Sequence, residues 1–210
     1  LLPNLEDLDI SMNNMKWSGA SCVVTALTNN EGPKTLKRFY ASKNGIGAEG
    51  AAIFGEALKS GSFPADLQVL DLSSNMFGRG NVDAVMAEND LSIEIGQKAI
   101  GEALSSNKAP RNLTNLNLAG NNLNIIGAEA LGDAIWSITS LLNIKSLNLK
   151  SNNLESKGVI SIFDALDQGN CTPYLQHLNL SYNFIGEEGA VKIGQVLGSG
   201  RCLYKLESLD

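Results

Sequence analysis

The sequence predicts an α/β solenoid, in which short strands and helices alternate along a curved, horseshoe-shaped stack of repeated units. Two observations indicate it: an eleven-residue phrase recurs along the chain, and an apolar stretch that opens with glycine follows each phrase. The asparagine of the phrase returns every 31 residues, with one interval of 46. These asparagines are Asn13, Asn44, Asn75, Asn121, Asn152 and Asn183. We therefore expect one repeat domain over residues 1–210.

The phrase has the pattern LxxLxLxxNxL and predicts a short strand followed by a turn. Its copies begin at Leu5, Leu36, Leu67, Leu113, Ile144 and Leu175, and Leu206 and Leu209 begin a seventh. The central LxL alternates at the period of a strand, so Leu8 and Ile10 should point inward, and the stacked strands should form one parallel sheet. The asparagine carries both a donor and an acceptor and can pair with backbone groups of the turn. We expect Asn121→Ala to cost about 1–3 kcal/mol.

The second half of each unit predicts a helix of about three turns. Its first residue is expected to be the recurring glycine, and Ile53, Ala57 and Leu58 show the spacing of one helix face. One strand and one helix cannot bury an apolar face alone, so each unit depends on its neighbours. The sheet should line the concave side of the solenoid and the helices the convex side. The glycines are Gly19, Gly50, Gly96, Gly127, Gly158 and Gly189.

These residues resemble the leucine-rich repeat, and within it the ribonuclease-inhibitor-like class, whose units look like LxxLxLxxNxIGxxGAxxLxxAL. The segments KNGIGAEGAAIFGEAL and YNFIGEEGAVKIGQVL are similar to that pattern. The resemblance covers essentially the whole chain and implies six full repeats plus a partial seventh, with a function in protein–protein interaction. The class includes ribonuclease inhibitor, the sensing domains of NOD-like receptors, the Ran GTPase activator and the CARMIL-type regulators. The sequence does not assign the chain to any one of these.

One unit is longer than the others. The recurring asparagine and glycine are 6 residues apart in five units, but Asn75 and Gly96 are 21 apart, which indicates a 15-residue insertion near 78–92. The insertion is acidic and lacks the Dx[DN]x[DN]G order of a calcium loop. Loops of this length are usually either functional or disordered. Both a mobile decoration and a partner-contacting loop fit the sequence.

The amino-acid composition limits which partners and which cellular compartment fit the protein. The net charge of −6 argues against nucleic acid and anionic membranes as main partners, and no apolar run is long enough to span a bilayer. Three cysteines cannot all pair internally and favour a reducing, cytoplasmic setting. Cys22 is expected to be buried, because it occupies the position of Ile53. Cys171 and Cys202 hold equivalent positions in consecutive units, so a disulfide between them is the alternative. The apolar ends predict a piece of a longer chain.

No catalytic, cofactor or metal motif stands out in the sequence. The run from Gly45 to Gly50 matches the GxGxxG of dinucleotide-binding proteins, but the equivalent segments NMKWSG and NLNIIG keep only the last glycine. Gly45 and Gly47 are therefore interpreted as turn residues. His177 is the single histidine, and no cysteine pair has zinc-ligand spacing. We expect no enzymatic activity, no cofactor, no metal and no small-molecule substrate.

The outward side chains of the strands form two rows across the predicted concave face. The central row holds Asp9, Tyr40, Asp71, Asn117, Asn148, Asn179 and Asp210, and the lateral row holds Asp7, Arg38, Val69, Asn115, Ser146, His177 and Ser208. Tyr40 is the best aromatic anchor, and Arg38 beside it could pair with an acidic group of a partner. The helices show no corresponding run of exposed anchors. The predicted partner-binding residues are Asp7, Asp9, Arg38, Tyr40, Asp71, Asn117, Asn148, His177 and Asn179. Alternatively, Asp and Asn recur there because the position faces solvent.

The function that fits best is a non-enzymatic binding module for another protein, of unknown identity, in a cytoplasmic scaffold or regulator. One alternative is a GTPase activator resembling the Ran activator, which would stimulate hydrolysis by ordering the GTPase's own groups. Another is the sensing domain of a NOD-like receptor, which a nucleotide-binding domain upstream would identify.

Overall fold

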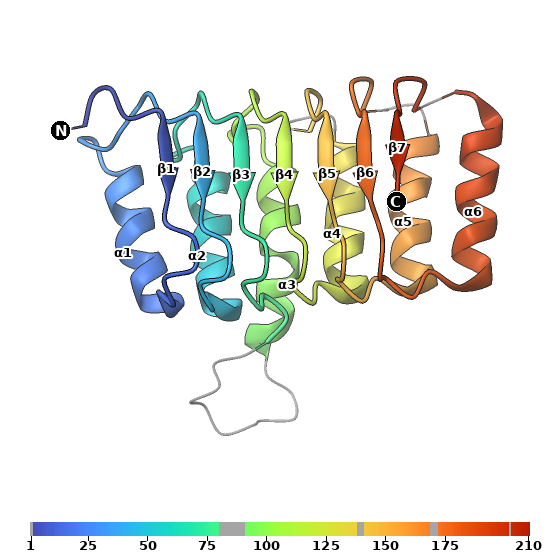
Figure 1. The fold of residues 1–210 in the computed structure, drawn as a ribbon, viewed down its shortest axis with the longest axis horizontal. Coiled ribbons are helices and arrows are strands. Elements are labelled where there is room, and N and C mark those ends of the chain that lie inside the picture. The colour runs from blue at the N-terminus through green and yellow to red at the C-terminus, as the bar shows by residue number, and fades with distance from the viewer. Residues whose placement is uncertain (1, 80–90, 138–140, 169–171, 202) are drawn as a thin grey trace.

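Strands and helices alternate along the whole described chain in a computed structural model (Figure 1). The structure describes residues 2–79, 91–137, 141–168, 172–201 and 203–210. The strands lie side by side in chain order, and the helices cover one face of the sheet only (Figure 1). The amino terminus and the last strand lie at opposite ends of the stack.

Seven strands form one parallel sheet in the order β1-β2-β3-β4-β5-β6-β7. Each strand is short and is centred on, or ends at, the first leucine position of the LxL segment, and the paired positions are equivalent in every unit. The predicted α/β solenoid is thus confirmed. The strands are β1 (Asp7–Asp9), β2 (Arg38–Tyr40), β3 (Val69–Asp71), β4 (Asn115–Asn117), β5 (Ser146–Asn148), β6 (His177–Asn179) and β7 (Ser208–Leu209).

The helices begin earlier than predicted. The recurring glycine was expected to be the first helical residue, but Gly50 is the fourth residue of a helix that starts at Gly47. The helix starts there because the Gly47 N–H donates to the Asn75 carbonyl of the next unit, which fixes the chain where it leaves the turn. The helices are α1 (Lys16–Thr28), α2 (Gly47–Ser60), α3 (Leu91–Leu104), α4 (Asn124–Trp136), α5 (Glu155–Asp167) and α6 (Gly186–Ser199).

The stack curves toward the sheet because its two layers have different spacings. Neighbouring strands lie about 4.8 Å apart, whereas packed helices lie about 8–10 Å apart. One strand and one helix per unit can satisfy both spacings only if the sheet takes the shorter, inner arc. The sheet therefore lines the concave side.

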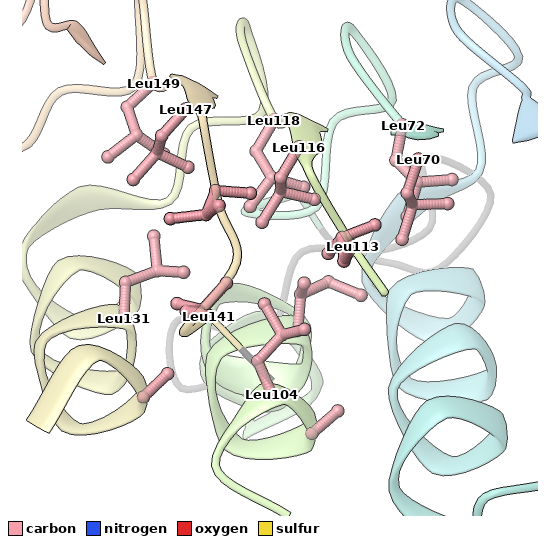
Figure 2. Close-up of a cluster of buried hydrophobic side chains, with 14 of the residues drawn as sticks. Leu70, Leu72, Leu104, Leu113, Leu116, Leu118, Leu131, Leu141, Leu147 and Leu149 are labelled. Atoms are coloured by element: carbon pink, nitrogen blue, oxygen red, sulfur yellow. The ribbon is translucent and has the colours of Figure 1, made fainter. Parts of the chain in front are cut away.

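The core lies between the sheet and the helices. Figure 2 shows the strand leucines of neighbouring units stacked above helix residues such as Leu104 and Leu131. Leu70, Leu116 and Leu147 are 0–2% exposed. Since each row of leucines is buried by the unit on either side, the core is continuous along the stack.

The repeat asparagines form a hydrogen-bonded ladder through the turns. The side-chain oxygen of Asn121 accepts the backbone N–H of Asn75 at 2.8 Å, and its amide donates to the carbonyls of Leu72 and Leu118 at 2.9 and 3.0 Å. The other inner asparagines make the same contacts and are 0–1% exposed. The predicted structural role of these residues is confirmed.

Left-handed backbone conformations surround each asparagine. Gly45 and Gly47 have φ of 60° and 71°, and the equivalent Asn14 and Lys16 have φ of 52° and 57°. The same turn thus forms with and without glycine. This agrees with the interpretation of Gly45 and Gly47 as turn residues.

The start of the insertion differs from the predicted boundary. Gly78 still belongs to the repeat, because its N–H donates to the Asn121 carbonyl at 2.9 Å as Gly47 does to Asn75. The Arg79 carbonyl accepts the Ala48 N–H at 3.1 Å. At the other end, Leu91 already begins α3. Residues 80–90, which carry most of the predicted insertion, lie outside the described residues.

Deleting residues 80–94 should leave the free energy of unfolding unchanged or raise it by up to about 1 kcal/mol. The deletion joins Gly78-Arg79 to Ile95-Gly96, which restores the 31-residue period and keeps both backbone bonds of the turn. Loop-closure entropy changes slowly with length, so the expected gain is small. Urea denaturation followed by circular dichroism measures it. A trimmed chain that does not fold would show that the segment supports the core.

The expected burial of Cys22 is wrong: the thiol is free and exposed. The equivalent Ile53 is half-buried, because α2 packs between α1 and α3, whereas α1 packs against α2 alone among the described helices. Cys171 and Cys202 lie outside the described residues, so their alternative disulfide stays a prediction.

Candidate functional site

The open face of the sheet presents the two predicted rows in register. Asp7 pairs with Arg38 and Asp9 with Tyr40 between β1 and β2, and the same alignment continues to His177 and Asn179 in β6. Paired positions of adjacent strands lie about 5 Å apart. The structure therefore brings all nine predicted site residues onto one continuous surface, while their role in partner binding stays a prediction.

Most central-row side chains cap the end of their own strand. The carboxylate of Asp9 accepts the Ser11 N–H at 2.9 Å, and Asp71 accepts that of Ser73 at the same distance. The donation from Ser11 lowers the pKa of the Asp9 carboxyl below its ordinary value. Asn117, Asn148 and Asn179 accept the equivalent N–H at 3.0–3.2 Å. The recurrence of Asp and Asn in this row thus has a local structural cause.

Tyr40 is the exception in the central row. It carries no acceptor that could cap the strand, and the Ser42 N–H is instead satisfied by the Ser11 hydroxyl at 3.1 Å. The half-buried Tyr40 ring is therefore not needed to satisfy the backbone at the end of its strand. This separates Tyr40 from the Asp and Asn residues of the row.

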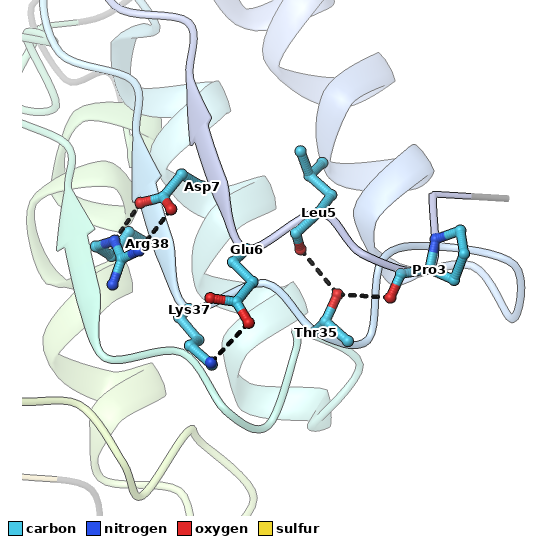
Figure 3. A network of polar contacts seen from close by, with 7 residues as sticks. All are labelled: Pro3, Leu5, Glu6, Asp7, Thr35, Lys37 and Arg38. Carbon is cyan, nitrogen blue, oxygen red and sulfur yellow. Dashed lines mark hydrogen bonds and ion pairs between the residues drawn. The ribbon is translucent and has the colours of Figure 1, made fainter.

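Arg38 is already paired inside the protein. Its guanidinium makes a two-pronged contact with the carboxylate of Asp7 on the next strand, and Lys37 pairs with Glu6 at 2.8 Å (Figure 3). The hydrogen bond from Arg38 lowers the pKa of the Asp7 carboxyl, and Asp7 in turn raises the pKa of Arg38. The Thr35 hydroxyl lies within hydrogen-bonding distance of the Pro3 and Leu5 carbonyls (Figure 3).

Arg38 is therefore not a free guanidinium, and its pairing with an acidic partner group stays a prediction. The local order of residues could not show this pairing, because Asp7 and Arg38 are 31 residues apart. Both side chains are substantially exposed, so the pair is weak and a partner could displace it at small cost.

The two halves of the concave face differ in charge. β1 to β3 carry Asp7, Asp9 and Asp71, whereas β4 to β6 carry neutral amides and hydroxyls with the exposed His177, whose Nδ1 lies 3.1 Å from the Ser208 hydroxyl. Lys150 follows β5, and its ammonium lies 5.0 Å from the centre of the Tyr182 ring. Three of the four carboxylates in the two rows thus lie in the first half, and the fourth, Asp210, stands at the far end and accepts the Asn179 amide at 3.3 Å.

The prediction that the convex helices show no run of exposed anchors was incomplete. Trp17 and Ile95 are 44% and 48% exposed and line an apolar groove with Ala52 and Ile53. Sequence periodicity missed this groove, because its lining comes from α1, α2 and α3 of three consecutive units.

Sequence reasoning also missed a polar groove at the edge where the strands begin. Its lining includes Lys145, Tyr174 and Lys205, which lie one or three residues before a strand. A signal was present in the sequence, because each unit has variable residues on either side of the first leucine of its phrase.

The fold and the ladder define an α/β repeat solenoid with an open concave sheet. The family model described as "Leucine Rich repeat" matches residues 2–24, 109–132, 140–163 and 173–194. The chain belongs to the leucine-rich repeat family. Among curated proteins, none matches it.

Two further observations concern the described part of the chain alone. Its histidine, cysteine, aspartate and glutamate side chains form no cluster of three that could hold a metal ion. None of its helices has the length and apolar character needed to cross a bilayer.

Proposed function

We propose that this chain is a non-enzymatic protein-binding module of a cytoplasmic protein and that it holds its partner on the concave face. The observation that carries the proposal is the open sheet itself. Parallel sheets are normally covered on both faces, but here the helices cover one face only (Figure 1), and the other face carries mainly polar side chains. Seven strands present these side chains on a rigid scaffold. Such a surface suits an extended contact with a protein.

Further features support a protein partner in a reducing compartment. Leucine-rich repeats generally act in protein binding. The net charge of −6 disfavours nucleic acid, and the exposed free thiol of Cys22 fits a reducing environment. The repeat pattern supports the ribonuclease-inhibitor-like class. Neither the GTPase-activator alternative nor the receptor alternative is favoured by any group of described residues.

Photo-crosslinking tests which face binds. A benzophenone amino acid placed at Ser146 in β5 faces the concave side, and the matched control at Glu129 lies on the exposed side of α4. We expect Ser146 to yield a defined protein adduct in extracts of the source organism, and Glu129 to yield none. Adducts from Glu129 alone would contradict the proposal.

Tyr40→Ala should weaken binding of the crosslinked partner by about 2 kcal/mol, because an aromatic ring with a hydroxyl is a typical interface anchor. Tyr40→Phe keeps the ring and should retain most of the affinity. Titration calorimetry with the purified partner measures the change, and thermal unfolding checks that both variants fold. If a folded Tyr40→Ala variant binds the partner as tightly as the unmodified protein, the main contact lies elsewhere on the concave face.

A further inference from the structure

A polar groove runs along the edge of the sheet where the strands begin. It has a volume of about 560 Å³ and extends from Gln68, just before β3, to Lys205, three residues before β7. We call it the rim groove. Between these ends its lining comes from the residues that precede β4, β5 and β6, namely Asn112, Thr114, Asn143, Lys145, Tyr174 and Gln176.

The charge of the rim groove is opposite to that of the protein. Its lining holds two lysines and no carboxylate, although the whole chain carries −6. The neighbours of Lys145 in the equivalent positions of adjacent strands are the neutral Thr114 and Gln176, and its ammonium forms no ion pair with any described residue. At the equivalent position of β2, Lys37 is neutralised by Glu6 at 2.8 Å. Lys145 is therefore a free cation where the repeat elsewhere supplies a partner.

Lys205 and Tyr174 form the second charged element. The Lys205 ammonium lies 4.6 Å from the centre of the Tyr174 ring, and the ring is 42% exposed. The ring holds the ammonium at the groove while leaving its charge without a carboxylate partner among the described residues. Tyr174 thus offers apolar area next to a cation.

Two carboxylates accept hydrogen bonds from groove residues at its two ends, and neither pairs with Lys145 or Lys205 among the described residues. Asp66 accepts the Asn112 amide at 3.2 Å, and Glu207 accepts the Gln176 amide at 2.9 Å. Between them, Asn143 donates its amide to the Arg111 carbonyl at 2.9 Å, which anchors that side chain. The groove floor is thus neutral and polar, with two free cations.

The spacing of these groups fits an extended peptide. Four strand intervals separate β3 from β7, which is about 19 Å, or the length of about six extended residues. Lys145 and Lys205 belong to units two strands apart, about 10 Å, so they match carboxylates two or three residues apart in such a peptide. Amides along the groove can pair with its backbone.

We propose that the rim groove binds an acidic, extended segment of a protein partner, with Lys145 and Lys205 pairing with its carboxylates and Tyr174 packing against it. This inference rests on the proposed function. It adds that one segment of the protein partner is acidic and extended.

Fluorescence anisotropy with a labelled hexaglutamate peptide and the full chain tests the inference. We expect binding at 50 mM NaCl that weakens at 300 mM, and no binding of hexaglutamine. The double variant Lys145→Gln, Lys205→Gln should lose more than tenfold in affinity. The matched control Lys37→Gln removes a lysine from the same row and should change affinity less than twofold, because Lys37 does not line the groove and is paired with Glu6. Tyr174→Ala changes no charge and should still lose at least threefold.

Three outcomes would overturn the inference. They are unchanged binding by the folded double variant, an equal loss in Lys37→Gln, and binding of a hexauridylate RNA as tight as that of hexaglutamate. The crosslink from Ser146 separates this result from the proposed function. If hexaglutamate fails to bind while Ser146 still captures a partner, the groove assignment is wrong and the concave-face proposal stands. If Ser146 captures nothing, the broader proposal fails.

Discussion

Asn121→Ala is expected to lower the free energy of unfolding by about 3 kcal/mol. The substitution removes the acceptor of the buried Asn75 N–H, which has no other partner in the turn. It also removes one of two donors from the carbonyls of Leu72 and Leu118, since Asn75 and Asn152 supply the other. One orphaned donor, two weakened acceptors and a small cavity account for the estimate.

Asn13→Ala is the matched control, because Asn13 occupies the same repeat position at the exposed end of the ladder. Its amide donates to the Ile10 and Ser11 carbonyls, and the residue is exposed, so water can replace both bonds. We expect a loss below about 1 kcal/mol. Urea denaturation of both variants measures the difference. Equal losses at the two positions would show that the ladder contributes no more when buried than at its end.

Gly101→Ala should destabilise the protein by about 3 kcal/mol, whereas Gly194→Ala should be neutral or stabilise it by up to about 1 kcal/mol. The two glycines occupy the same position of α3 and α6, five residues after the recurring glycine. A Cβ added at Gly101 would lie 2.6 Å from the backbone carbon of Ala130 in α4, so α3 and α4 must separate. No described atom lies within 4 Å of the same Cβ at Gly194.

The two substitutions are expected to change the free energy of unfolding in opposite directions, so together they test how closely the helices pack. In α6 the added methyl meets solvent, and alanine is the better helix former. In α3 it meets backbone, which cannot rotate away as a side chain can. Thermal and urea unfolding of both variants, with far-ultraviolet circular dichroism to confirm native helix content, give the two values. A stable Gly101→Ala variant would mean that α3 and α4 are farther apart than described.

Several features of this protein follow from the sequence alone. The 31-residue interval predicts the repeat, the LxL segments predict the strands, and the asparagines predict the turns. These features are predictable because each depends on residues close together in the chain and recurs in every unit. The order of the two concave rows follows as well, since parallel strands in equal register place equivalent residues side by side.

Other features depended on the tertiary structure because they join side chains of different units. The pairing of Arg38 with Asp7 and the contact of Gly101 with Ala130 arise only when neighbouring units pack, and Cys22 is exposed because α1 packs against α2 alone among the described helices. The same holds for Lys145, whose free charge depends on which residues precede the adjacent strands. A repeat pattern specifies where each position lies, whereas the size and charge of its neighbours decide whether that position is paired, closely packed or open to a partner.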